Sequence, residues 1–186
     1  LERVRLQDLV DEVLGLFEEK AFRKQLKLRQ CLENVDVETD AVLLKQIIYN
    51  LISNAIKYTP SGEVMVLGTR DDRGRFLLTV RDTGVGIPRG HIEEVFMEYY
   101  RLPRHRNGGE DGLGIGLALV RRAAALLGYR VSLKSREGRG SSFILKIPAE
   151  RVTLHRMVEV AQADTIPGDL DGNANHLVLL LENDEV

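Results

Sequence analysis

Two asparagines and a lysine, whose side chains can bind a metal ion or a phosphate, recur at helical spacing in NLISNAIKYT, residues 50–59. On a helix, with about 100° between successive residues, Asn50, Asn54 and Lys57 fall on one polar stripe. Amide oxygens can coordinate a hard cation such as Mg2+, and a lysine ammonium group can contact a phosphate. The stripe therefore predicts a site for Mg2+ and phosphate, although a polar stripe can also simply face solvent.

A second candidate lies in RDTGVGIP, residues 81–88, directly after a run of residues that predicts a strand. Asp82 would stand at the strand end, where its carboxylate could accept a hydrogen bond from the amino group of a ligand. Gly84 and Gly86 would let the backbone approach a flat ligand closely. The same residues also fit an ordinary turn, so this stretch alone leaves both interpretations open.

A third candidate is the glycine-rich stretch GLGIGLALV, residues 112–120. It places Gly112, Gly114 and Gly116 at the start of a predicted helix, where free backbone N–H groups and the helix dipole favour an anion. The stretch lacks the lysine of a P-loop, and a dinucleotide fingerprint would need a preceding parallel strand and a downstream acid. Taken alone, it is a weak indication of phosphate binding.

The elements that must position these residues follow from the hydrophobic periodicity. Apolar residues at intervals of three and four predict helices over 6–25, 40–58 and 113–127. Alternating and β-branched runs predict strands at 26–30, 63–68, 75–81, 130–134 and 142–147. Turn residues at 71–74 and 135–141 predict two hairpins. The pattern indicates an α+β fold, a two-layer α/β sandwich whose mixed, mainly antiparallel sheet carries helices on one face.

The composition is that of an ordinary globular domain, with 186 residues, 44% of them hydrophobic, and a formal net charge of -2. This balance of charges predicts no nucleic-acid partner and no direct contact with a membrane surface. The single cysteine, Cys31, excludes an internal disulfide and a cysteine-based zinc cluster. No apolar run reaches the about 20 residues that cross a bilayer. We expect a cytoplasmic setting, whether or not a longer parent is anchored in the inner membrane.

The composition changes near the C-terminus. Residues 1–148 contain the elements above, whereas 149–176 are rich in turn formers and acids and predict a linker. Residues 177–186, LVLLLENDEV, predict the first strand of a further unit. Alternatively, this last run could add to an exposed edge of the sheet.

Taken together, the motifs resemble a known family. The stretches NLISNAIKYT, DTGVGIP, FMEYYR, GLGIGLALV and GRGSSFILKIP are similar, in this order, to the N, G1, F and G2 boxes of the ATP-binding domain of sensor histidine kinases. That domain has the Bergerat fold and belongs to the wider GHKL group, which includes gyrase, Hsp90 and MutL. The resemblance covers residues 1–148, and five stretches in one order make it far more specific than any single motif.

The resemblance implies a role for each matching residue. Asn50 and Asn54 match the pair that holds Mg2+ at the nucleotide phosphates, and Lys57 matches a phosphate-contacting position. Tyr58 would line the nucleotide site, and Asp82 matches the aspartate that binds the adenine amino group. The other implied nucleotide-binding positions are Gly84, Gly86, Ile87, Gly112, Leu113, Gly114, Ile115, Gly116, Leu117 and Ser141.

Two further features bear on catalysis. Residues 97–111 would form a lid over the phosphates, with Arg101 contacting a phosphate next to Phe96 of the F box; the alternative is an ordinary surface loop. With Asn50 and Lys57, Arg101 completes the implied catalytic set. Asn50 also occupies the position where gyrase, Hsp90 and MutL carry the glutamate that activates water, so fast hydrolysis of ATP is disfavoured.

The function implied by the resemblance is two-component signalling. The chain would bind ATP with Mg2+ and supply the γ-phosphate to a histidine on a separate, upstream dimerisation and histidine phosphotransfer domain. None of its four histidines matches the phosphoaccepting one, so we expect no autophosphorylation by this chain alone. Residues 177–186 are similar to the first strand and acidic cluster of a receiver domain, which implies a hybrid parent and a response regulator or receiver as partner. A regulatory module without transferase activity and an anti-sigma-type serine kinase remain alternatives.

Overall fold

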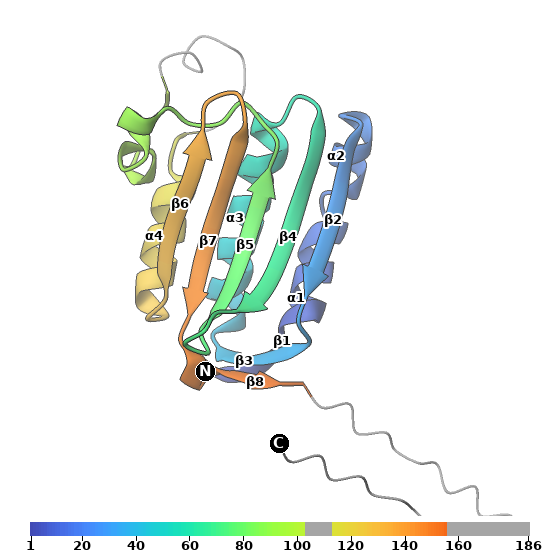
Figure 1. The fold of residues 1–186 in the computed structure, drawn as a ribbon, viewed down its shortest axis with the longest axis vertical. Coiled ribbons are helices and arrows are strands. Elements are labelled where there is room, and N and C mark those ends of the chain that lie inside the picture. The colour runs from blue at the N-terminus through green and yellow to red at the C-terminus, as the bar shows by residue number, and fades with distance from the viewer. Residues whose placement is uncertain (103–112, 156–186) are drawn as a thin grey trace, which may run out of the picture. The chain divides into compact units, whose positions relative to one another are not determined.

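The computed structural model describes residues 1–102 and 113–155 (Figure 1). Part of the predicted lid, most of the predicted linker and the receiver-like tail lie outside these residues. Along the chain the elements are β1 Glu2–Arg5, α1 Leu6–Gly15, α2 Glu18–Arg23, β2 Leu26–Leu32, β3 Val35–Thr39, α3 Ala41–Tyr58, β4 Gly62–Arg70, β5 Phe76–Asp82, the short 3-10 turns η1 Arg89–His91 and η2 Glu94–Phe96, α4 Gly116–Leu126, β6 Arg130–Arg136, β7 Gly140–Ile147, η4 Ala149–Arg151 and β8 Val152–Leu154.

The main sheet contains all five predicted strands, in the order β2-β4-β5-β7-β6. The strand pairs β4–β5 and β6–β7 are antiparallel, which confirms both predicted hairpins, and only β2 runs parallel to its neighbour β4. The four α-helices lie behind this sheet in Figure 1, all on the same face. The predicted α+β sandwich, with a mixed and mainly antiparallel sheet, is therefore confirmed.

The core lies between the sheet and the helices, and the side-chain alternation of a strand explains it. On β5, Phe76, Leu78 and Val80 are fully buried or nearly so, and the residues between them face the open side of the sheet. From the helix layer, Ile48 and Leu51 of α3 are equally buried. Removing these apolar surfaces from water is the main driving force for forming the two layers.

The first predicted helix, 6–25, is not continuous. The N–H groups of Leu16 and Phe17 bond to carbonyls only three residues back, which closes α1 in a tight turn before α2 begins. Gly15 favours this break because glycine is a poor helix former. Phe17 turns into the core, where 4% of its surface is exposed.

A second, three-stranded sheet of order β1-β3-β8 was not predicted. Its strands β1 and β8 have four and three residues, too few to give a clear period. β8 also lies within the predicted linker, 149–176, yet it pairs antiparallel with β3, and Val152 of β8 is buried. The folded part of the chain therefore continues beyond residue 148.

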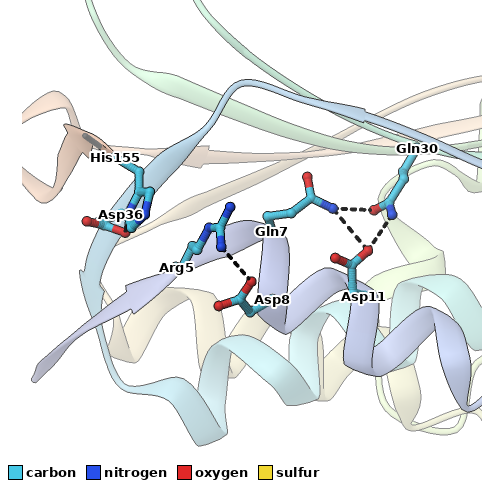
Figure 2. A network of polar contacts seen from close by, with 7 residues as sticks. All are labelled: Arg5, Gln7, Asp8, Asp11, Gln30, Asp36 and His155. Carbon is cyan, nitrogen blue, oxygen red and sulfur yellow. Dashed lines mark hydrogen bonds and ion pairs between the residues drawn. The ribbon is translucent and has the colours of Figure 1, made fainter. Parts of the chain in front are cut away.

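Side-chain contacts join α1 to the edge strand β2 and the end of β8 to β3 (Figure 2). Gln7 of α1 donates hydrogen bonds to Asp11, at 3.0 Å, and to Gln30 of the edge strand β2, at 3.1 Å. His155, just after β8, contacts Asp36 of β3 at 2.7 Å. The first group joins α1 to β2, and the second fixes the end of β8 to β3.

Candidate functional site

A cavity of about 950 Å3 lies between α3, the start of α4 and the strands β5 and β7. Its volume is in the range of small-molecule sites. The predicted site residues that line it are Asn50, Asn54, Lys57, Tyr58, Asp82, Gly86, Ile87, Arg101, Leu113, Gly114, Ile115, Gly116, Leu117 and Ser141. Of the other predicted residues, Gly84 is not part of this lining, and Gly112 lies outside the described residues. The structure thus brings together residues that are up to 91 positions apart, from Asn50 to Ser141.

The polar stripe of α3 faces this cavity. Nδ2 of Asn50 donates to the carbonyl oxygen of Gln46, at 2.8 Å, which orients the amide and leaves Oδ1 as an acceptor. A Cβ atom placed on Gly116 would lie 3.0 Å from this Oδ1 and 3.9 Å from Nδ2 of Asn54. The start of α4 is therefore directly opposite the two asparagines, where a phosphate could contact both the stripe and the N-terminus of a helix.

The donors that the structure offers fit Mg2+ bound together with a nucleotide. Over residues 1–102 and 113–155, no group of three or more His, Cys, Asp or Glu side chains is arranged to hold a metal ion. Mg2+ usually keeps several waters and is bound through one or two protein oxygens and the phosphates of its substrate. The amide oxygens of Asn50 and Asn54 would be those protein ligands.

Asp82 is a buried acid at the end of β5, with 5% of its surface exposed. Its Oδ1 accepts hydrogen bonds from the backbone N–H groups of Gly84, at 2.8 Å, and Ser141, at 3.2 Å. Because both bonds end on Oδ1, Oδ2 remains as the acceptor for a ligand in the cavity. Burial raises the pKa of Asp82 from its ordinary value, and these two hydrogen bonds oppose the rise.

Gly84 joins the loop after β5 to the end of α3. A methyl group on Gly84 would overlap the carbonyl oxygen of Tyr58, which accepts a hydrogen bond from the N–H of Val85 at 3.1 Å. The absent side chain thus allows two segments of the protein to approach each other closely, and the approach of Gly84 to a ligand stays a prediction. Gly86, two residues on, does line the cavity and has the positive φ, 64°, that glycine adopts readily.

The C-terminal end of α3 is held by a lysine from another helix. Nζ of Lys24, just after α2, donates to the carbonyl oxygens of Ile56, at 3.0 Å, and Lys57, at 2.9 Å. These carbonyls lie in the last turn of α3, where a positive charge also favours the helix dipole. Nζ of Lys57 itself lies 5.2 Å from the centre of the Tyr58 ring. Lys24 therefore fixes the backbone that presents two cavity-lining side chains.

The two F-box residues, Phe96 and Arg101, have different positions relative to the cavity. Arg101 lines the cavity, whereas Phe96 is not part of its lining. Phe96 instead packs edge-on against Phe143 of β7, with ring centroids 6.3 Å apart, and Phe143 lines the cavity. Phe96 thus supports the cavity wall from behind.

Seven residues of the cavity lining were not predicted. They are Ser53, Val85, Val95, Tyr100, Leu102, Leu119 and Phe143. Most are small or apolar side chains that carry no chemical signal in the sequence, since they read equally well as core. Tyr100 is different, because it directly precedes Arg101 and could have been included with it.

Within the described ranges, no helix combines the length and the apolar character that crossing a membrane requires.

Two of the four histidines lie in the described residues. His91 and His155 are partly buried and paired with acids, Glu94 and Asp36, both at 2.7 Å. His105 and His176 lie outside the described residues.

Comparison with known proteins agrees with the geometry. The family described as histidine kinase-, DNA gyrase B- and HSP90-like ATPases matches residues 39–151. The circadian input-output histidine kinase CikA of Synechococcus elongatus is 34% identical over 186 residues, 97% of this chain and 24% of CikA. The aerobic respiration control sensor protein ArcB of Escherichia coli K12 is 41% identical over 118 residues, 62% of this chain and 15% of ArcB.

Solved structures give the same result. The catalytic domain of the histidine kinase ThkA, in a nucleotide-free form, has a TM-score of 0.67 and 28% identity over 80% of this chain and 95% of that domain. Full-length ShkA in complex with AMPPNP has a TM-score of 0.69 and 28% identity, and the match covers 80% of this chain and 31% of ShkA. This chain spans less than a quarter of the length of ArcB and about a quarter of CikA.

The fold and the site define an ATP-binding domain of the Bergerat type. The chain belongs to the family of histidine kinase-, DNA gyrase B- and HSP90-like ATPases, and it is similar to the catalytic domains of sensor histidine kinases.

Proposed function

We propose that this chain binds Mg-ATP in the cavity and positions the γ-phosphate for transfer to a histidine on a separate dimerisation domain. The main support is the juxtaposition of three kinds of group around one cavity. Asp82 offers a buried acceptor for the adenine amino group, and Asn50 and Asn54 offer amide oxygens for Mg2+ opposite the start of α4. The AMPPNP in the related ShkA structure is an ATP analogue, which supports the choice of nucleotide.

The roles of the remaining residues follow from charge. Lys57 and Arg101, both on the cavity wall, would neutralise phosphate oxygens, which is the main requirement of phosphoryl transfer. Asn50 offers an amide but no carboxylate base, so it cannot take a proton from an attacking water. We therefore expect slow hydrolysis of ATP and retention of the γ-phosphate for a protein acceptor.

Nucleotide binding is tested by calorimetric titration of the chain with ATP, with and without Mg2+. Asp82→Ala should weaken binding of ATP about 10-fold or more, because a hydrogen bond to a charged group is lost. Asn54→Ala should reduce the gain in affinity that Mg2+ gives while leaving Mg2+-free binding nearly unchanged. Wild-type protein without measurable affinity for ATP or ADP would contradict the proposal.

Transfer is tested by mixing the chain with a purified dimerisation and histidine phosphotransfer domain and labelled ATP. We expect label on the histidine of that domain, and on a response regulator or receiver domain added afterwards. ATP binding without any transfer would favour the alternative, a nucleotide-binding regulatory module. Label on a serine of a partner protein would instead favour a serine kinase of the anti-sigma type.

A further inference from the structure

Three polar side chains meet beside the cavity, outside the residues that the proposed function uses. The hydroxyl oxygen of Tyr100 lies 2.6 Å from Oε2 of Glu94 and 2.5 Å from Nδ1 of His91. The same Oε2 lies 2.7 Å from Nδ1 of His91. Glu94 and His91 belong to η2 and η1 and are not part of the cavity lining, whereas Tyr100 is. The cluster therefore connects two turns behind the wall to an aromatic ring in the wall.

The charge of Glu94 strengthens this cluster. The hydrogen bond from Tyr100, followed by the one from His91, lowers the pKa of Glu94 from its ordinary value. The group is thus a carboxylate at neutral pH, and the Tyr100 hydroxyl donates to it. A hydrogen bond to an ionised acceptor is roughly twice as strong as one between neutral groups.

The backbone next to Tyr100 is also constrained. Tyr99 has a φ of 63°, which is a true outlier for a bulky side chain and persists only where surrounding contacts enforce it. Its N–H donates to the carbonyl oxygen of Gly114 at 3.0 Å. A Cβ atom on Gly114 would lie 2.9 Å from the carbonyl oxygen of Tyr100, so the two backbones are in close contact. The position of Tyr100 is therefore coupled to that of Gly114, which also lines the cavity.

We propose that Glu94 is a positioning residue, which holds the Tyr100 hydroxyl and thereby sets the Tyr100 ring and the Gly114 backbone in the wall of the nucleotide site. His91 assists by donating from Nδ1 to the same oxygen of Glu94. Glu94 acts through Tyr100 and does not touch the nucleotide. This inference rests on the proposed function, since it assigns the purpose of the cluster to ATP affinity.

The test is a double-mutant cycle on ATP affinity, measured by calorimetry with Mg2+ present. Glu94→Ala and Tyr100→Phe should each weaken binding about 3- to 10-fold, the effect of one such hydrogen bond. The double variant should be no weaker than the weaker single variant, because both changes break the same contact. Glu94→Gln keeps an oxygen acceptor and should recover part of the affinity. Tyr99→Phe is the matched control, since that side chain is 71% exposed, and it should bind like wild type.

A second measurement does not depend on nucleotide. Amide hydrogen exchange of Tyr99, whose N–H bonds to Gly114, should be faster in Glu94→Ala and Tyr100→Phe than in wild type without ATP. Independent losses of affinity that multiply in the double variant, or unchanged exchange, would overturn the inference. A third result separates the two proposals. If exchange at Tyr99 is faster in both variants but the wild-type protein binds no ATP, the proposed function is overturned, and with it the purpose assigned to the cluster.

Discussion

At the scale of single residues, the site depends on polar side chains that give one atom to the protein and keep the other for a ligand. Asn50 donates its Nδ2 to a backbone carbonyl of its own helix and keeps Oδ1. Asp82 accepts two backbone N–H groups on Oδ1 and keeps Oδ2. Because hydrogen bonds to the protein backbone already orient each side chain, it does not lose further side-chain entropy when the ligand binds.

The burial of Asp82 predicts that this residue lowers the stability of the fold at neutral pH while it raises the affinity for ATP. Burial raises its pKa in the folded protein, so the charged form is disfavoured there. The contribution of Asp82 to stability is fully present below the pKa of the unfolded chain and is lost as pH rises through the raised pKa of the folded protein. At neutral pH, Asp82→Asn should therefore be more stable than wild type and yet bind ATP more weakly.

Thermal unfolding of both proteins over a pH series checks this expectation. The difference in stability should disappear as pH falls below the pKa of an unfolded aspartate. The same acidification should weaken ATP binding by wild type, since a protonated Asp82 no longer offers a full carboxylate to the adenine amino group. An Asp82→Asn protein that is less stable than wild type at neutral pH would contradict the assigned cause of the pKa shift.

At the scale of elements, the contact between the β5 loop and the end of α3 depends on Gly84. Gly84→Ala places a methyl group on the Tyr58 carbonyl oxygen, so we expect a loss of about 1–3 kcal/mol in the free energy of unfolding. ATP affinity should also fall, because Asp82 and Tyr58 would move apart. Gly90→Ala is the control: its added methyl group meets no atom within 4 Å. Urea denaturation of both variants gives the comparison, and equal stabilities would argue against this contact.

The cap that Lys24 provides for α3 is a second element-scale prediction. Lys24→Met retains the aliphatic stem but removes the hydrogen bonds to two carbonyls, at 3.0 and 2.9 Å, and should cost about 1–2 kcal/mol of stability. ATP affinity should fall as well, since the last turn of α3 carries Lys57. The matched control is Lys20→Met, at an exposed lysine of α2, the helix that Lys24 directly follows. Chemical denaturation that finds the two variants equally stable would show that the cap is not important.

The elements also show what the sequence could predict. The five strands of the main sheet and the helix α3 follow from local periodicity and turn residues, and all of them are confirmed. The small sheet was not predicted because β8 gains its conformation from pairing with β3, more than 110 positions earlier, and not from its own three residues. The site motifs were readable because their polar and glycine residues are unusual where they stand. The contacts of Tyr100 with Glu94 and His91 could not be predicted, because only the turns η1 and η2 bring these partners to it.

At the scale of the whole molecule, the described chain consists of the main sheet with its helices and a small sheet that closes one end of it (Figure 1). The cavity is built at the ends of β5 and β7 and at α3, whereas β8 pairs with β3, the strand that precedes α3. Val35 and Val37 of β3 are fully buried. The small sheet thus holds the segment from which α3 begins, and its integrity matters to the helix that carries the polar stripe.

A shortened chain tests this dependence. A protein that ends at residue 148 lacks β8, so it exposes one edge of β3 and loses the burial of Val152 and the contact between His155 and Asp36. Burying one valine contributes about 1.5–3 kcal/mol. We therefore expect the free energy of unfolding of the chain ending at 148 to be lower than that of a chain ending at 155 by about 1.5 kcal/mol or more. Val152→Ala in the full chain should fall between the two in urea denaturation. If the shorter protein unfolds at the same urea concentration as the longer one, β8 is not part of the folding unit, and the boundary predicted at residue 148 is correct.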